Sequence, residues 1–118
     1  MPHLKVREVL EQVDNLLPNQ YSAVQKRRWI AQAEGFVAVE ILGEAAPETV
    51  TDDTVLVVEP PYDELYRHYV EAQIHYANGE IERYSNAAAA WNSSFLGYRD
   101  LYTRTHPPKA AVKALKLC

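Results

Sequence analysis

Apolar side chains recur every three or four residues through the last third of the chain, which is the spacing of one face of a helix. This stripe has seven members, most of them aromatic: Ile81, Tyr84, Ala88, Trp91, Phe95, Tyr98 and Tyr102. It predicts a helix from Glu80 to Thr103, about 36 Å long at the usual rise per residue. Pro107 and Pro108 then end it. So long a stripe needs a packing partner, either the chain's own helices or a second copy.

Two shorter helices are predicted in the first third of the chain. The first has six apolar residues on one face: Val6, Val9, Leu10, Val13, Leu16 and Leu17. Pro18 disfavours helix in the residue before it, so this helix is expected to stop at Leu17. The second is expected to begin at Ser22, a favourable N-cap residue, and to end at Gly43.

A third helix is expected over 62–77, where five residues share a face: Tyr62, Leu65, Tyr69, Ala72 and Tyr76. Asn78-Gly79 is a turn signal between this pattern and the next. Together the two segments predict a tight antiparallel helical hairpin. A continuous helix with a kink is the alternative.

The segment 44–61 has a different character, with three prolines and several acids. Within it Thr54–Val58 is β-branched and apolar, so a short strand is possible. The sequence offers no obvious second strand, which leaves pairing with a neighbouring subunit or packing as an extended loop. The expected fold is therefore all-α, a bundle of about four helices in one domain over 1–106, followed by a flexible basic tail over 107–118.

Composition agrees with a single globular domain, since 47% of the 118 residues are apolar and 24% are charged. No stretch approaches the 18–20 apolar residues of a membrane span, and the first residues, MPHLKVREVL, lack the apolar part of a signal peptide. We therefore expect a soluble protein made in the cytoplasm. Its single cysteine, Cys118, allows no internal disulfide and has no obvious histidine to activate it as a nucleophile.

Charge is unevenly distributed along the chain, although the net value is only −4. Residues 41–64 hold seven acids and no Lys or Arg, whereas 103–118 hold four basic side chains and no acid. The basic residues are Arg104, Lys109, Lys113 and Lys116. Such a tail either has its own partner or keeps the protein solvated, and the sequence favours neither.

Two groups of titratable residues invite a catalytic or metal-binding interpretation. His68, Glu71 and His75 have helical spacing, but bundle metal sites draw further ligands from other helices, and exposed polar residues are the better interpretation. Glu80, Glu82 and Arg83 stand at a helix start, where the helix dipole accounts for the acids. We therefore expect no enzyme activity, no metal and no cofactor.

Lys26-Arg27-Arg28-Trp29 is a short basic run beside an aromatic residue. Nucleic-acid binding combines basic and stacking groups, so a small helical DNA-binding or regulatory module is the alternative function. A solvated helix face or a salt-bridged subunit contact explains three charges equally well. Asn92-Ser93-Ser94 matches the glycosylation sequon but falls inside a predicted helix, and we discount it.

Tyrosine is the unusual residue of this chain, with seven of eight copies between 62 and 102. A tyrosine pairs an apolar ring with a polar tip, which suits either a partly wet interface or a core whose hydroxyls reach solvent. The middle of the stripe, at Ala88 and Trp91, is expected to pack on the chain's own helices. Its ends, at Tyr84, Tyr98 and Tyr102, are the candidates for a subunit interface.

Most of the chain resembles a group of small proteins encoded beside capsid genes in tailed phages and prophages of Gram-positive bacteria. The resemblance runs through 62–109 and includes 6–21 and 26–30, but not the acidic loop at 43–54. Its markers here are PYDELY (61–66), AQIHYANGEIERY (72–84), NAAAAWN (86–92) and RTHPP (104–108). None of these is a catalytic signature.

The resemblance implies a head–tail connector, also called an adaptor or head-completion protein. Such a subunit is helical and forms a ring, typically of twelve copies, beneath the portal protein. The ring extends the channel through which DNA passes and joins the head to the next neck, stopper or tail protein in the virion. By the same resemblance, residues 104–118, with Arg104, Lys109, Lys113 and Lys116, are the candidate portal-binding tail.

Overall fold

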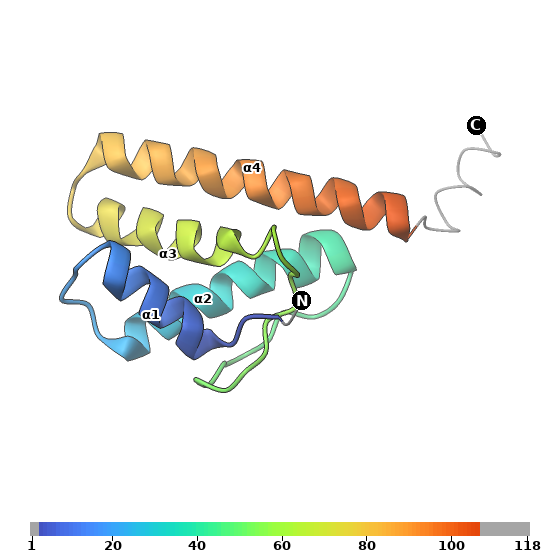
Figure 1. Ribbon diagram of the computed structural model, residues 1–118, viewed down its shortest axis with the longest axis horizontal. Coiled ribbons are helices and arrows are strands. Elements are labelled where there is room, and N and C mark those ends of the chain that lie inside the picture. Colours follow the sequence, from blue (N-terminus) through green and yellow to red (C-terminus); the bar gives the residue numbers. More distant parts are fainter. Residues whose placement is uncertain (1–2, 107–118) are drawn as a thin grey trace.

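The computed structural model describes residues 3–106, and these residues form four α-helices (Figure 1). They are α1 (Val6–Leu16), α2 (Ala23–Val37), α3 (Glu64–Ala77) and α4 (Ile81–Thr105), and a π-helical turn, η1 (Ala38–Leu42), continues α2. No β-strand occurs within this part of the chain, so the predicted all-α class is confirmed. Helix α3 is central, with α4 along one side and α1 and α2 against the other (Figure 1). The predicted tail over 107–118 lies outside the described residues.

The predicted helix ends agree with the structure within one or two residues. The Ser22 hydroxyl accepts a hydrogen bond from the Gln25 N–H at 3.1 Å, as expected of an N-cap. Gly43 ends η1 in the left-handed conformation, with φ 68°, which glycine adopts without steric cost. Asn78-Gly79 closes the predicted hairpin, and Gly79 likewise has a positive φ of 76°. Helices α3 and α4 are therefore antiparallel neighbours, as the sequence predicted.

The core is built by the first three helices and the loop that precedes α3. Its largest fully buried members, all below 2% exposure, are Val6, Val9 and Val13 of α1, Ile30 and Val37 of α2, Leu56 and Val58 of the loop, and Leu65, Tyr66, Val70 and Ile74 of α3. The valines of α1 recur at intervals of three and four, so one helical stripe enters the core.

The segment Thr54–Val58 is extended but forms no strand, which corrects the possibility raised from its β-branched residues. A single bridge joins Val55 to Lys5, with hydrogen bonds from Val6 N–H to the Thr54 carbonyl and from Leu56 N–H to the Leu4 carbonyl, at 3.0 and 2.8 Å. The pairing partner is thus the chain's own N-terminal segment, which turns into α1 after one bridge.

A buried carboxylate takes over the polar contacts that a sheet would supply to this segment. Glu34 of α2 is 8% exposed, and its two oxygens accept hydrogen bonds from the Val57 N–H at 2.9 Å and the Tyr66 hydroxyl at 2.5 Å. The Val58 N–H in turn donates to the Tyr66 oxygen at 3.1 Å. Burial raises the pKa of Glu34, and these hydrogen bonds oppose the rise in part. Glu34 therefore fastens the loop to both α2 and α3.

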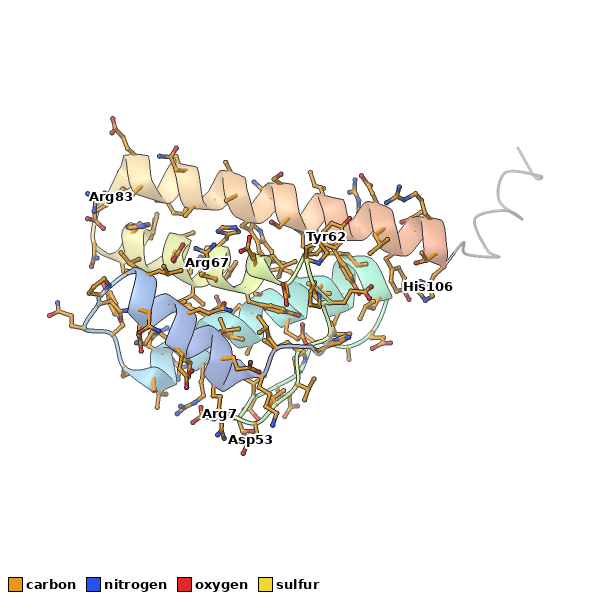
Figure 2. All side chains as sticks on the ribbon, in the orientation of Figure 1. Arg7, Asp53, Tyr62, Arg67, Arg83 and His106 are labelled. Atoms are coloured by element: carbon orange, nitrogen blue, oxygen red, sulfur yellow. The ribbon has the colours of Figure 1, made fainter. Side chains whose placement is uncertain are left out.

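Two ion pairs fix the acidic turn of the same loop against the helices. Arg7 of α1 pairs with Asp53, and the two side chains meet at the edge of the molecule in Figure 2. Arg27 of α2 pairs with Asp52 at 3.1 Å. Part of the acidic segment seen in the sequence is therefore matched by basic residues of α1 and α2.

Candidate functional site

Helix α4 is longer than anything it packs on. It has 25 residues against 14 in α3, about 37 Å against about 21 Å of helix axis. Tyr98 is the one buried residue of α4. Most of this helix therefore lies on the surface, and no other helix within residues 3–106 covers the face turned away from α3 (Figure 1).

The middle of the stripe packs on the chain's own helices, as predicted. The Trp91 ring lies 5.0 Å from Tyr69 of α3 and 6.3 Å from Phe36 of α2, and Phe95 lies 5.1 Å from Trp91, measured between ring centroids. These distances are typical of edge and tilted aromatic pairs. The cluster joins α4 to α2 as well as to α3.

The end of the stripe near the hairpin turn is open to solvent. Tyr84 is half-buried and meets Tyr76 of α3 edge-on at 5.2 Å. Tyr76 and Ile81 are each 62% exposed. Tyr76, Ile81 and Tyr84 together form the apolar tip of the hairpin. Tyr76 was expected only as a member of one face of the third helix. Its position two residues before Asn78-Gly79 is the sequence signal that places it at the hairpin turn.

The other end of the stripe is divided between core and surface. Tyr98 is 5% exposed and packs on Tyr62 at 6.1 Å, where Gly97 leaves room because a Cβ there would lie 3.1 Å from the Tyr62 ring. Tyr102 is half-buried and stacks on His106 at 4.2 Å. Tyr98 is thus enclosed by its own chain, contrary to the expectation that it is presented to a neighbour. Tyr84 and Tyr102 remain accessible.

The outer face of α4 has no charge over fifteen consecutive residues, Tyr84 to Tyr98. Its exposed side chains in this span are small or amide-bearing, with one large apolar residue, and they are Ser85, Asn86, Ala89, Asn92, Ser93 and Leu96. Charged residues flank the span at Arg83 and Arg99, which Figure 2 shows for Arg83 at the hairpin end. Depletion of charge is typical of the core of a protein interface.

The basic run of α2 is used within the fold. Lys26 is buried, and its Nζ donates to Asp14 at 2.6 Å and to Asn19 at 3.1 Å. Burial would raise the pKa of Asp14, but the hydrogen bonds from Lys26 and Asn19 outweigh it and lower the pKa. Arg27 pairs with the acidic loop and Trp29 is 9% exposed. Arg28 alone of the four stays exposed without an ion pair among the described residues, so no basic and aromatic stripe reaches the surface.

The titratable residues of α3 make separate contacts. Glu71 pairs with Arg67 at 3.1 Å, His75 contacts Glu80 at 2.9 Å, and burial lowers the pKa of His68. In residues 3–106 no group of three His, Cys, Asp or Glu side chains is arranged to hold a metal ion. Glu80 also contacts Arg83 at 3.3 Å, whereas Glu82 is exposed, and the three side chains line an open hollow of about 270 Å³ at the hairpin turn.

Of the predicted basic tail, only Arg104 belongs to the described residues, where it is exposed in the last turn of α4. Lys109, Lys113 and Lys116 lie outside them. Asn92 and Ser93 of the sequon are exposed on α4. None of the described helices combines the length and apolarity needed to cross a membrane.

No protein-family model matches this chain, and searches of curated proteins and of solved structures found no match either. The accessible candidates are the outer face of α4, the apolar tip and the Tyr102 end.

Proposed function

We propose that this chain is the subunit of a head–tail connector ring in a tailed phage or prophage, located in the virion neck. The observation that carries the proposal is α4: a 25-residue helix with one buried residue and a central outer face that has no charge. In a monomer, the part of this helix that does not cover α3 adds little to the stability of the fold. A neighbouring copy would cover the rest.

The chemistry of this face suits repeated contact between copies. Small side chains such as Ala89 and Ser93 allow close approach of a second helix, and Leu96, 43% exposed, offers an apolar anchor. In a ring each subunit uses two different surfaces, so that the contact closes on itself after a fixed number of copies. The resemblance suggests twelve copies, with the DNA passing through the central channel.

The resemblance also supplies the proposed neighbours: the portal protein above and a neck, stopper or tail protein below. Arg104, Lys109, Lys113 and Lys116 would bind the portal. Tyr84 and Tyr102 are the stripe residues proposed to meet a neighbouring subunit, whereas Tyr98 supports α4 from within. No catalytic step, metal or cofactor enters this function.

Electron microscopy of the full chain, with and without portal protein, tests the ring. We expect rings that form on the portal or alone, and loss of these rings on Leu96→Glu and Ala89→Glu with an unchanged melting temperature. Leu16→Glu is the matched control, because Leu16 is 64% exposed on α1, away from α4. Rings that survive both α4 variants would contradict the proposal.

The tail assignment has its own test. A chain without residues 107–118 is expected to keep its circular dichroism spectrum and to lose portal binding. Undiminished portal binding by this chain would overturn the tail assignment and leave the ring proposal standing.

A further inference from the structure

A second surface, on the helix pair α2–η1, has an open apolar groove of about 660 Å³. Its floor is lined by Ala31, Gly35, Phe36, Val39, Ala46 and Tyr69. Phe36 is 47% exposed and Val39 is 53% exposed. The loop at Ala46 lies close over Gly35, where an added Cβ would lie 3.3 Å from the Ala46 Cβ. Large apolar side chains exposed together in a hollow commonly mark a binding surface.

The charge at this groove is mainly acidic. Glu40 and Glu48 line it, and Glu44 belongs to the same connecting segment. No ion pair within residues 3–106 involves any of the three, whereas Asp52 and Asp53 further along the acidic region are both paired. Arg28 also lines the groove and is a basic exception. An occupant with apolar and basic side chains would fit both the floor and these glutamates.

We propose that the groove binds residues 109–118 of the same chain. This segment, KAAVKALKLC, holds only basic charges, at Lys109, Lys113 and Lys116. The three lysines are four and three residues apart, and Ala111 and Leu115 are four apart, which is the spacing of two faces of a helix. An amphipathic segment laid into an apolar groove is a recurring mode of peptide recognition. The lysines would meet Glu40, Glu44 and Glu48 while Leu115 meets the apolar floor.

The connection is long enough for this contact within one chain. Tyr69 of the groove lies beside Trp91, and Trp91 precedes Thr105 by fourteen residues, so about 21 Å of α4 separates the groove from the helix end. Residues 106–108 span about 10 Å when extended, and the seven residues 109–115 add about 10 Å as a helix, so Leu115 can reach about 20 Å from Thr105, close to this separation. A tethered segment has an effective concentration of about 1 mM, so it outcompetes a second copy in dilute solution. The contact belongs to the free chain and does not depend on the proposed ring.

A spin label on Cys118 tests this contact, because Cys118 is the only cysteine of the chain and labelling is unambiguous. In the labelled, ¹⁵N-enriched full chain, we expect the amide signals of Ala31, Gly35, Val39 and Ala46 to lose more than half of their intensity. Reduction of the label should restore them. Signals of α1, such as that of Leu16, should keep their intensity. Full intensity at the groove in the labelled chain would overturn the proposal.

A mixed sample separates contact within a chain from contact between copies. It combines spin-labelled chain without ¹⁵N and ¹⁵N-enriched Cys118→Ser chain. We expect no broadening at the groove in this mixture at low concentration. Broadening as strong as in the doubly labelled chain would show that the segment binds a second copy, and it would overturn the intramolecular proposal.

Charge-reversal substitutions test the pairing of the lysines with the groove. Those at Glu40 and Glu48 should leave the fold intact, because both side chains are exposed. Glu40→Lys with Glu48→Lys should abolish the broadening, and adding Lys113→Glu and Lys116→Glu to that chain should restore at least half of it. Val39→Asp should also abolish it, with Leu16→Asp as the control at another exposed apolar residue. Broadening that persists in the Glu40→Lys, Glu48→Lys chain would contradict the charge pairing.

Discussion

Two regions of this molecule differ in how completely they use their side chains within the chain. In α1, α2, α3 and the 54–58 segment, the buried apolar side chains meet in one core, and no buried side-chain polar atom among the described residues lacks a hydrogen-bond partner. In α4 a single residue is buried, and the outer face from Tyr84 to Tyr98 is uncharged but uncovered. The first region forms the core, whereas the second leaves a helical surface exposed. Substitutions in the first region should therefore lower the stability of the fold, and substitutions in the second should impair assembly.

The largest effect is expected at the one point where α4 belongs to the core. Tyr98→Ala removes a ring that is 5% exposed and should lower the free energy of unfolding by about 3 kcal/mol. Tyr102→Ala removes a half-buried ring one turn later and should cost less than about 1 kcal/mol. Urea denaturation of both variants measures the difference.

Tyr98→Phe is the control for this pair, because it keeps the ring and its packing on Tyr62. It should stay close to the wild type. Equal losses for Tyr98→Ala and Tyr102→Ala would mean that the whole C-terminal end of α4 is core, and the division between the two regions would be misplaced.

The next effect is expected in the buried network of the first region. Glu34→Ala leaves the Val57 N–H and the Tyr66 hydroxyl without their acceptor, and this should cost about 2 kcal/mol. Gln32→Ala, two residues away on the exposed side of α2, loses only a surface hydrogen bond from Tyr69 and should cost less than about 0.5 kcal/mol. Similar midpoints of thermal unfolding for the two variants would show that Glu34 does not hold the loop.

The contrast between the regions also explains which features were predictable. The four helices follow from local patterns, since Ser22 caps α2, Gly43 ends η1 and Asn78-Gly79 closes the hairpin. The 54–58 segment does not follow from such a pattern, because its conformation depends on Glu34 and on the N-terminal residues, both distant in sequence. A lone glutamate on an apolar face carries no local signal of the contact that it makes.

The candidate surface shows the same limit. The stripe correctly placed Trp91 against other helices, but seven apolar positions spaced three and four residues apart do not reveal how far the partner helix extends. Tyr98 is buried because the Tyr62 side chain, which precedes α3, reaches over Gly97. Lys26 is enclosed because the turn at Asn19 folds over it. In each case a loop residue covers a helix residue, and helical periodicity does not encode loops.

A pH effect is expected from the same buried carboxylate. Burial raises the pKa of Glu34 in the folded state, while the hydrogen bonds of Tyr66 and Val57 and the nearby His3 lower it in part. A carboxyl whose folded pKa exceeds its unfolded value binds its proton more tightly in the folded state. Its contribution to stability is therefore full below the unfolded pKa and is lost as pH rises through the folded pKa.

Wild type and Glu34→Gln are compared from pH 4 to pH 7 to isolate this contribution, because the remaining carboxyl groups, including Asp14 and Asp63, are common to both chains. The difference in free energy of unfolding should move in favour of the wild type as the pH is lowered. A constant difference over this range would show that Glu34 titrates alike in the folded and unfolded chains.

The smallest effects on the free energy of unfolding are expected when one basic residue in each region is replaced by methionine. Lys26→Met keeps the apolar stem but removes the ammonium that bonds Asp14 and Asn19, and it should cost about 1 kcal/mol because Lys26 is buried. Arg83→Met removes an ion pair with Glu80 whose arginine is 68% exposed at the start of α4, and it should cost close to zero.

Raising the salt concentration should erase any effect of Arg83→Met and leave most of that of Lys26→Met, since a buried pair is screened less. Equal costs for the two, or a Lys26→Met effect that vanishes in salt, would mean that the basic run of α2 is a surface feature and would return it to the candidates for binding a nucleic acid.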